Sequence, residues 1–214
     1  DAIGRRLNRL SEDCIQVLTT AAVVGREFDF RLLSVLMDDF TETELLELVE
    51  EALEAHVIEE LLAGTEGYQF SHALIQETLS EESSTSRKVR LHARIAEALE
   101  ELYGTDAESH AAELAHHFAQ AEAAVGTEKL VRYSLLAGER ASTTHAYEEA
   151  LTHFNLGLAS KSGQPMDLET AQLLHGLGAA QVATLPLYRM GEAVDSLSRA
   201  FHYFVDSGLV EHAL

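Results

Sequence analysis

The spacing of apolar residues predicts a chain that is helical almost throughout, with one short strand-rich segment. The first predicted helix follows Ser11, has acidic residues in its first turn and apolar residues at helical spacing, and stops at Gly25. A second helix is predicted from Asp29, and a third from Thr41, where Thr41-x-x-Glu44 forms a capping-box pattern. The first part of the chain is therefore predicted to contain three helices in succession.

The pattern changes after the third predicted helix. His56–Glu59 and Tyr68–Phe70 are strand-like, and Gly64–Gly67 between them is typical of a turn. A fourth helix is predicted over 71–79, and the polar segment 83–86 is the predicted domain boundary. Three helices followed by a β-hairpin is the order of elements in a winged helix, so this domain is predicted over residues 1–86.

From residue 87 to the end, every pattern is helical, and the helices are predicted to pack in pairs. The spacing of Gly138, Ala150, Phe154 and Gly157 resembles that of a tetratricopeptide (TPR) hairpin. Its second half recurs at Ala193, 43 residues after Ala150, compared with about 34 in a standard repeat. The last predicted helix is marked by Val194, Leu197, Ala200, Phe201 and Phe204. The predicted fold is thus mostly α: a winged helix with a small β-hairpin, then a TPR-like superhelical arm over 87–214, truncated at its C-terminus.

Charge and composition exclude several classes of function. The 214 residues include 15 Lys and Arg against 36 Asp and Glu, a net charge of −21, which repels phosphate backbones and anionic lipid. The predicted third helix is acidic and has no Lys or Arg from Asp38 through Leu62, so it is not expected to bind DNA. The chain has no apolar stretch of 18 residues, and it has a single cysteine, so a reducing compartment is the simplest interpretation. Together with the negative charge, this predicts a cytoplasmic protein without membrane or direct nucleic-acid partners.

Several stretches resemble bacterial STAND-type signalling NTPases, the family of large LuxR-type regulators and multidomain cyclases and kinases. Residues 68–79 (YQFSHALIQETL) and 87–99 (RKVRLHARIAEAL) are similar to the end of the family's winged helix and the helix after it. Residues 21–28 (AAVVGREF) resemble the start of that domain. Residues 114–118 (LAHHF) and 201–208 (FHYFVDSG) resemble its helical-repeat arm.

The resemblance implies a regulatory segment rather than an enzyme. The family's order is an NTPase core, a winged helix, a helical sensor arm and an output module. This chain has no G-x-x-x-x-G-K-[ST] loop to hold phosphates, so no cofactor is expected here, and ATP or ADP is implied only for the parent protein. The implied partners are a protein, peptide or small inducer on the arm and the NTPase domain of the same chain. The alternative is a stand-alone TPR adaptor or scaffold.

His72 is the candidate nucleotide sensor of the parent protein. Related NTPases carry a Met-His-Asp motif at this point, and its histidine approaches the β-phosphate of the bound nucleotide. Here the triplet is Ser71-His72-Ala73, so the histidine is retained without its Met and Asp neighbours. An imidazole at the start of a helix can donate to a phosphate oxygen. The simpler interpretation is a histidine that packs or caps at a strand–helix junction.

The other candidates belong to interaction surfaces. Arg87, Lys88 and Arg90 are part of a basic cluster that could contact an acidic neighbour or the NTPase core, or be a solvated helix start paired within this acidic chain. Stacked helical pairs form a concave groove that typically binds a peptide or another domain. The candidate residues for that groove, which could alternatively stabilise the repeat stack, are Tyr133, Arg140, His145 and Tyr147.

Metal and thiol chemistry are not predicted. His110 precedes His116 by six residues, about 600° of helix, so the two side chains point to different sides, and Glu113 and His117 do not complete an H-E-x-x-H pattern. Cys14 lies on the apolar face of its helix without a basic neighbour in the pattern, which favours a buried structural thiol over a nucleophile.

Overall fold

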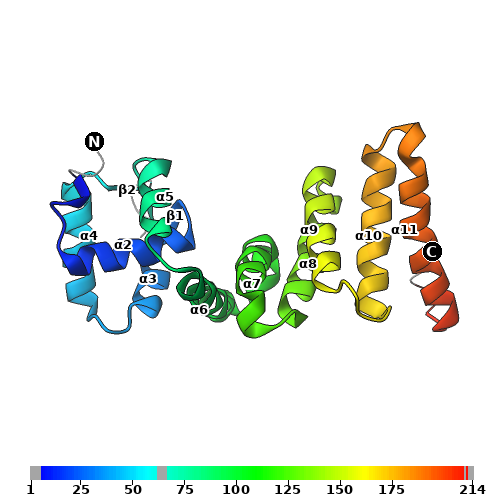
Figure 1. Ribbon diagram of the computed structural model, residues 1–214, viewed down its shortest axis with the longest axis horizontal. Helices are drawn as coiled ribbons and strands as arrows, with labels where there is room; N and C mark the ends of the chain where they lie inside the picture. The colour runs from blue at the N-terminus through cyan, green and yellow to red at the C-terminus, as the bar shows by residue number, and fades with distance from the viewer. Residues whose placement is uncertain (1–5, 62–66, 210, 212–214) are drawn as a thin grey trace. The chain divides into compact units, whose positions relative to one another are not determined.

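The computed structural model describes residues 6–61, 67–209 and 211. They form a mostly helical protein with a small three-stranded antiparallel sheet, which confirms the coarse fold prediction (Figure 1). Contacts divide the chain into two compact units, Asp1–Leu102 and Tyr103–Leu214. The sequence predicts a boundary after residue 86, whereas the units divide after Leu102, so the helix beginning at Thr85 is grouped with the first unit.

Helices of the first unit begin where a side chain caps their free backbone amides. Three of these helices are α2 (Glu12–Val24), α3 (Phe30–Leu36) and α4 (Glu42–Glu54). The Ser11 hydroxyl accepts a hydrogen bond from the Cys14 amide (3.2 Å), and Asp29 caps α3. Thr41 and Glu44 form the reciprocal capping box of α4. The predicted starts of all three helices are confirmed.

A short sheet lies beside these helices. Its strands are β1 (Glu27–Asp29), β2 (Ile58–Glu60) and β3 (Gly67–Phe70). The order is β1-β3-β2, with Phe28 opposite Tyr68 and Ile58 opposite Phe70. Strand β3 confirms the second strand-like segment, and β2 confirms Ile58 and Glu59 of the first, whereas His56 lies in a turn with a φ of 54°. Strand β1 was not predicted, because three residues are too few to show an alternating pattern. Residues 64–66 of the predicted turn lie outside the described residues.

Two further helices complete the first unit, α5 (Ala73–Glu81) and α6 (Thr85–Tyr103). Helix α5 buries Ile75 and Leu79 in the core, and the Gln76 side chain donates to the Ala22 carbonyl of α2 (2.9 Å). Arg94 of α6 donates to the Leu36 carbonyl at the end of α3 (3.1 Å). The core that α5 shares with α2, α3, α4 and the sheet includes Val17, Leu18, Leu33, Leu45, Val49, Ile58 and Phe70.

The second unit is a succession of helices, each packed against the next. They are the 3₁₀ helix η1 (Gly104–His110), α7 (Ala111–Val125), α8 (Glu128–Thr143), α9 (Tyr147–Ser160), α10 (Leu168–Thr184), the 3₁₀ helix η2 (Leu187–Arg189) and α11 (Met190–Asp206). Helix α10 contacts α8 as well as its sequence neighbours α9 and α11. Helices α8, α9 and α10 therefore all contact one another.

One aromatic ring joins three of these helices. Phe154 of α9 is 1% exposed and fills the space left by glycines on its neighbours. A Cβ atom at Gly138 of α8 would lie 2.5 Å from the ring, and one at Gly176 of α10 would lie 2.4 Å from it. Both distances are shorter than real contacts allow, so the absence of a side chain at these two positions is what lets α8 and α10 approach the ring.

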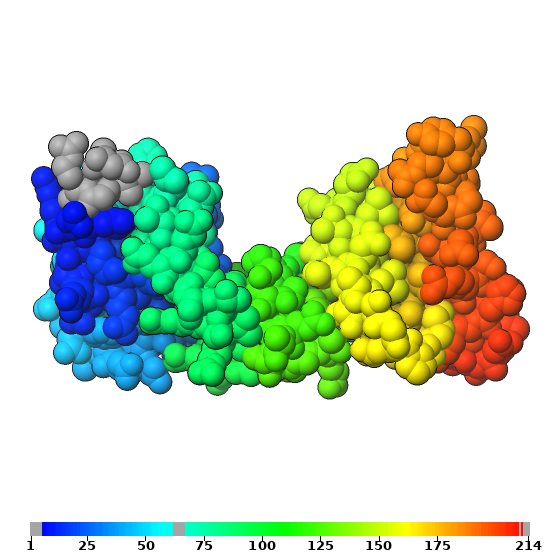
Figure 2. Space-filling model, viewed as in Figure 1, coloured from blue at the N-terminus to red at the C-terminus, as the bar shows by residue number. Residues whose placement is uncertain are grey.

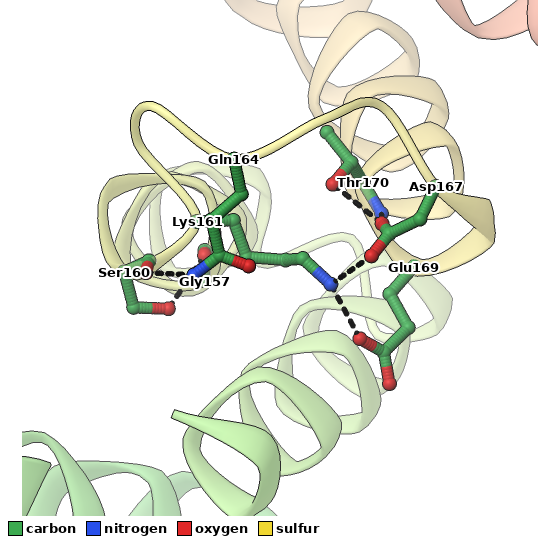
Figure 3. A network of polar contacts seen from close by, with 7 residues as sticks. All are labelled: Gly157, Ser160, Lys161, Gln164, Asp167, Glu169 and Thr170. Carbon is green, nitrogen blue, oxygen red and sulfur yellow. Dashed lines mark hydrogen bonds and ion pairs between the residues drawn. The ribbon is translucent and has the colours of Figure 1, made fainter. Parts of the chain in front are cut away.

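A buried lysine connects the end of α9 to the start of α10. The Lys161 side chain is 7% exposed, pairs with Asp167 and donates to Glu169 (2.7 Å; Figure 3). Asp167 also caps α10 by accepting from the Thr170 amide (2.9 Å) and hydroxyl (2.7 Å). Burial alone would lower the pKa of Lys161, but hydrogen bonds to the two carboxylates outweigh it and raise the pKa.

Helix α11 is covered on one face only. Among the residues that mark it in the sequence, Ala200 and Phe204 are buried, whereas Val194 and Phe201 are 61% and 50% exposed. The connection from α10 (orange in Figure 2) also exposes Leu187. The helix buries the face that meets α10 and leaves a neighbouring apolar stripe in contact with solvent.

Candidate functional site: the groove between helices α8 and α10

A groove of about 380 Å³ opens between α8 and α10 in the second unit. Phe154 of α9 and Phe204 of α11, both buried, are among the residues that line it. Helix α8 contributes Glu139, Ser142 and Thr143, and helix α10 contributes Gln172, His175, Gly176 and Ala179. Phe154 packs between Gly138 of α8 and Gly176 of α10 and is almost completely buried, so it forms the packed floor over which the groove opens.

The polar groups of the groove fall into two sets. The Ser142 and Thr143 hydroxyls donate to carbonyls of their own helix, at 2.9 Å and 2.7 Å. Within the described residues, the side chains of Glu139, Gln172 and His175 have no hydrogen bond or ion pair. A carboxylate, a carboxamide and an imidazole in one concave site are therefore available to a ligand.

The charge of the groove comes from Glu139. Partial burial raises the pKa of this carboxyl group, because desolvation disfavours its ionised form. The adjacent Arg140 does not neutralise it, since its guanidinium donates to the Ser109 carbonyl of η1 (2.7 Å). The His175 ring packs edge-on against Phe204, with centroids 6.3 Å apart. The site combines an apolar base with an incompletely solvated acid.

None of the four predicted arm residues lines this groove. Tyr133 is 1% exposed and its ring stacks on Phe118 (5.6 Å between centroids), so it belongs to the packing of α7 on α8. Arg140 and His145 are exposed near the end of α8, and Tyr147 is half-buried against the core of the second unit. For Tyr133, the alternative role of stabilising the stack is the one its burial fits.

Sequence reasoning missed the residues that do line the groove. Gln172, His175 and Ala179 recur at i, i+3 and i+7 on α10, which is the spacing of one helix face. That signal was present in the sequence but mixed polar and small residues, so it did not resemble an apolar stripe. Glu139 is one of many acidic residues in the chain, and its special position depends on α10 lying beside α8.

His72 occupies the N-cap position of α5. Its backbone is extended (φ −143°, ψ 137°), and its side chain is exposed and makes no capping hydrogen bond. The preceding Ser71 instead forms the local contacts, since its hydroxyl donates to the His56 carbonyl (2.9 Å). The imidazole therefore neither packs nor caps in this structure, and it is free to contact another surface.

Some of the basic residues of α6 line a second cavity, which lies within the first unit. Arg87 and Arg90 line a cavity of about 330 Å³ together with Arg94, which forms an ion pair with Asp38 (3.2 Å). Lys88 is half-buried and does not line it. No ion pair of Arg87, Lys88 or Arg90 is found in the part of the chain that the structure describes.

The histidine-rich segment does not form a metal centre. His110 stacks on Tyr103 with centroids 3.6 Å apart and pairs with Asp106 (3.4 Å), while His117 is buried and His116 is exposed. Across residues 6–61, 67–209 and 211, no group of three or more His, Cys, Asp or Glu side chains is arranged to hold a metal ion.

Cys14 is a structural thiol. It is completely buried, and its sulfur atom lies 3.3 Å from the Leu48 carbonyl. Burial, with a smaller effect from the negative charge of Glu51, raises the pKa of the thiol to about 12. Such a thiol stays protonated near neutral pH and is a poor nucleophile.

Comparison with known proteins gives little additional information. No protein-family model and no solved structure matches the chain. Over 192 residues, 89% of this chain, it is 27% identical to an uncharacterized protein of Rhizobium meliloti (strain 1021). The aligned segment is only 18% of that protein's length. Among the described residues, no helix combines the length and apolar character needed to cross a membrane.

Proposed function

We propose that the chain is a non-catalytic regulatory and protein-interaction segment of a STAND-type signalling ATPase. In this proposal the second unit binds a protein, peptide or small inducer in the α8–α10 groove. The first unit passes that event to a nucleotide-binding core elsewhere in the parent protein. The observation that carries the proposal is a concave groove on stacked helices, with a largely apolar lining and polar side chains that have no partner within the described residues.

The elements of the first unit support a winged-helix assignment. Helices α2, α3 and α4 precede the antiparallel β2–β3 pair, and β1 adds a third strand to the other edge of β3. The acidic face of α4 is unsuited to phosphate backbones, which favours a structural, interdomain role over DNA binding. The same three-helix and hairpin order is what the resemblance to the STAND family implies.

The packing of the second unit supports a TPR-like arm. Gly138 packs against Phe154, and Gly157 is buried against Leu173, so the small residues lie where neighbouring helices come close, as expected for a helical hairpin. Helix α10 contacts the preceding pair of helices, α8 and α9, which is the arrangement of a continuous stack. The match to a small part of a much longer Rhizobium meliloti protein supports a multidomain parent.

His72 provides a route from this segment to the nucleotide. Its exposed imidazole stands at the start of α5, directly after the β2–β3 pair. In the parent protein, we expect it to donate to a phosphate of ADP or ATP held by the core. The exposed Arg87 and Arg90 are candidates for contact with an acidic surface of the same core.

The first test is to read the coding sequence on both sides of this segment. A G-x-x-x-x-G-K-[ST] loop within roughly 150–350 residues upstream, the reach of one or two domains, is the expected result. Its absence would refute the ATPase assignment. The α8–α10 groove would then favour the second candidate, a helical-repeat adaptor that needs no nucleotide.

The second test measures ADP release from the full-length parent. Loss of one hydrogen bond to a charged phosphate, about 1.5–3 kcal/mol, predicts at least roughly ten-fold faster release for His72→Ala. The exposed His202 of α11 is the matched control, and His202→Ala should leave the rate unchanged. Release at the wild-type rate from the His72 variant would exclude the relay role of this residue.

A further inference from the structure

We propose that the α8–α10 groove takes a positively charged side chain, a lysine or arginine presented by a peptide segment of a protein partner. The proposal rests on the proposed function only in treating the groove as the partner-binding surface. It adds the chemical class of the group that the partner must present.

The charge of the lining residues points to a cation. Glu139 is the one carboxylate among them, and no Lys or Arg lines the groove. Its sequence neighbour Arg140 is held by the Ser109 carbonyl of η1 (2.7 Å), so the closest guanidinium along the chain is committed elsewhere. A net charge of −21 adds a long-range attraction for basic segments and repels acidic ones.

The shape of the groove fits a single long side chain. Its volume of about 380 Å³ is near the lower end of small-molecule sites, and too small to accept an entire helix. Gly176 and Ala179, which are not buried, offer apolar surface to the methylene stem of a lysine or arginine. Glu139 is exposed, so its carboxylate is open to an incoming cation, and desolvation by its surroundings raises its pKa.

A purely apolar occupant fits less well. It would cover Glu139, Gln172 and His175 without giving them partners, and each polar group buried unsatisfied costs about 1–3 kcal/mol. A cationic side chain gives the carboxylate an ion pair, and the peptide backbone that carries it can bond the carboxamide and the imidazole.

The experiment titrates the ¹⁵N-labelled 214-residue chain with small probes and follows amide chemical shifts. The probes are N-acetyl-lysine methylamide, its uncharged analogue N-acetyl-norleucine methylamide and the acidic N-acetyl-glutamate methylamide. We expect the lysine probe to shift the amides of Thr143, Gly176 and Ala179, which line the groove. It should bind roughly two- to five-fold more tightly than the norleucine probe, as expected for an ion pair with an exposed carboxylate, and the glutamate probe should bind most weakly.

Variants show whether Glu139 is the cause. Glu139→Gln should abolish the preference for lysine over norleucine while keeping the weak binding of norleucine, which also reports that the groove is still formed. Glu148→Gln, at an exposed position of α9 outside the groove, is the matched control and should keep the full preference. The inference is overturned if the groove amides do not shift, if lysine binds no better than norleucine, or if the preference survives in Glu139→Gln.

These outcomes are independent of the test of the parent protein. A lysine preference without an upstream phosphate-binding loop would leave the inference intact in a helical-repeat adaptor. An upstream loop without a lysine preference would retain the ATPase assignment and remove the inference.

Discussion

Replacing Lys161 with methionine isolates the contribution of the ion cluster between α9 and α10. Methionine keeps an unbranched apolar stem of similar length, so the packing of the buried part changes little. The substitution removes one ammonium group and leaves Asp167 and Glu169 without their shared partner (Figure 3). Asp167 still caps α10 through Thr170, so the helix start is retained in the variant.

The expected loss of stability follows from the exposure of the three groups. Breaking a buried ion pair by removing one partner costs about 3–5 kcal/mol, because a charge is left buried and unpaired. Here the Lys161 side chain is 7% exposed, but Asp167 and Glu169 are 46% and 45% exposed, so water can solvate both carboxylates in the variant. The loss should therefore be smaller, about 1–2 kcal/mol.

Urea denaturation followed by circular dichroism measures this difference, and a double-mutant cycle assigns its cause. If the ion pair is responsible, Glu169→Gln should destabilise the wild type but be neutral or stabilising in the Lys161→Met background. A loss below about 0.5 kcal/mol for Lys161→Met, or additive effects in the cycle, would contradict this reasoning.

The pH dependence supplies an independent check. Burial alone would raise the pKa of Asp167, but hydrogen bonds from Lys161 and Thr170 outweigh it and lower the pKa. The contribution of Asp167 to the free energy of unfolding is therefore present above the ordinary Asp pKa, about 3.9, and is lost as pH falls through the lowered pKa. Because the pKa of Lys161 is raised, its contribution to the free energy of unfolding is present below about pH 10.4, the ordinary Lys pKa, and is lost as pH rises through the raised pKa. The difference between wild type and Lys161→Met should be constant between these limits and shrink outside them.

Three further experiments test the packing around Phe154, the cap of α4 and the burial of Cys14. Gly176→Ala places a methyl group 2.4 Å from Phe154 and should destabilise the second unit by about 1–3 kcal/mol in urea, whereas Gly191→Ala, with open space around it, should be neutral or slightly stabilising. Thr41→Ala removes the cap of α4 and should cost about 1 kcal/mol by the same assay, and an unchanged midpoint would argue against the capping box. Because burial raises the pKa of Cys14 to about 12, its reaction with a disulfide reagent at pH 8 should be far slower in the folded protein than in urea; equal rates would contradict its burial.

The local structure of the first unit could be predicted because the signals are local. Thr41 and Glu44 are three residues apart, and their capping box depends only on the backbone between them. Asp29 and Ser11 are similarly readable as caps. Strand β1 escaped prediction because its pairing with β3 joins residues about forty positions apart, and three residues of its own carry no pattern.

The candidate site could not be predicted in the same way, because it depends on which helices become neighbours. Tyr133 and Glu139 lie on the same helix, and nothing in their own sequence indicates that the first packs against α7 while the second faces α10. Val194 and Phe201 show the same limit, since periodicity identifies an apolar side of α11 but not how much of that side is covered.

Because Phe154 packs between Gly138 and Gly176, the residues at these three positions constrain one another in evolution. A side chain at Gly138 or Gly176 would clash with the Phe154 ring, which would have to shift at a cost in stability. In related chains we therefore expect the three positions to change together: a smaller residue at 154 should accompany alanine or serine at 138 or 176. Phenylalanine at 154 should occur mostly with glycine at both 138 and 176, so the three residues together would identify the groove in a sequence.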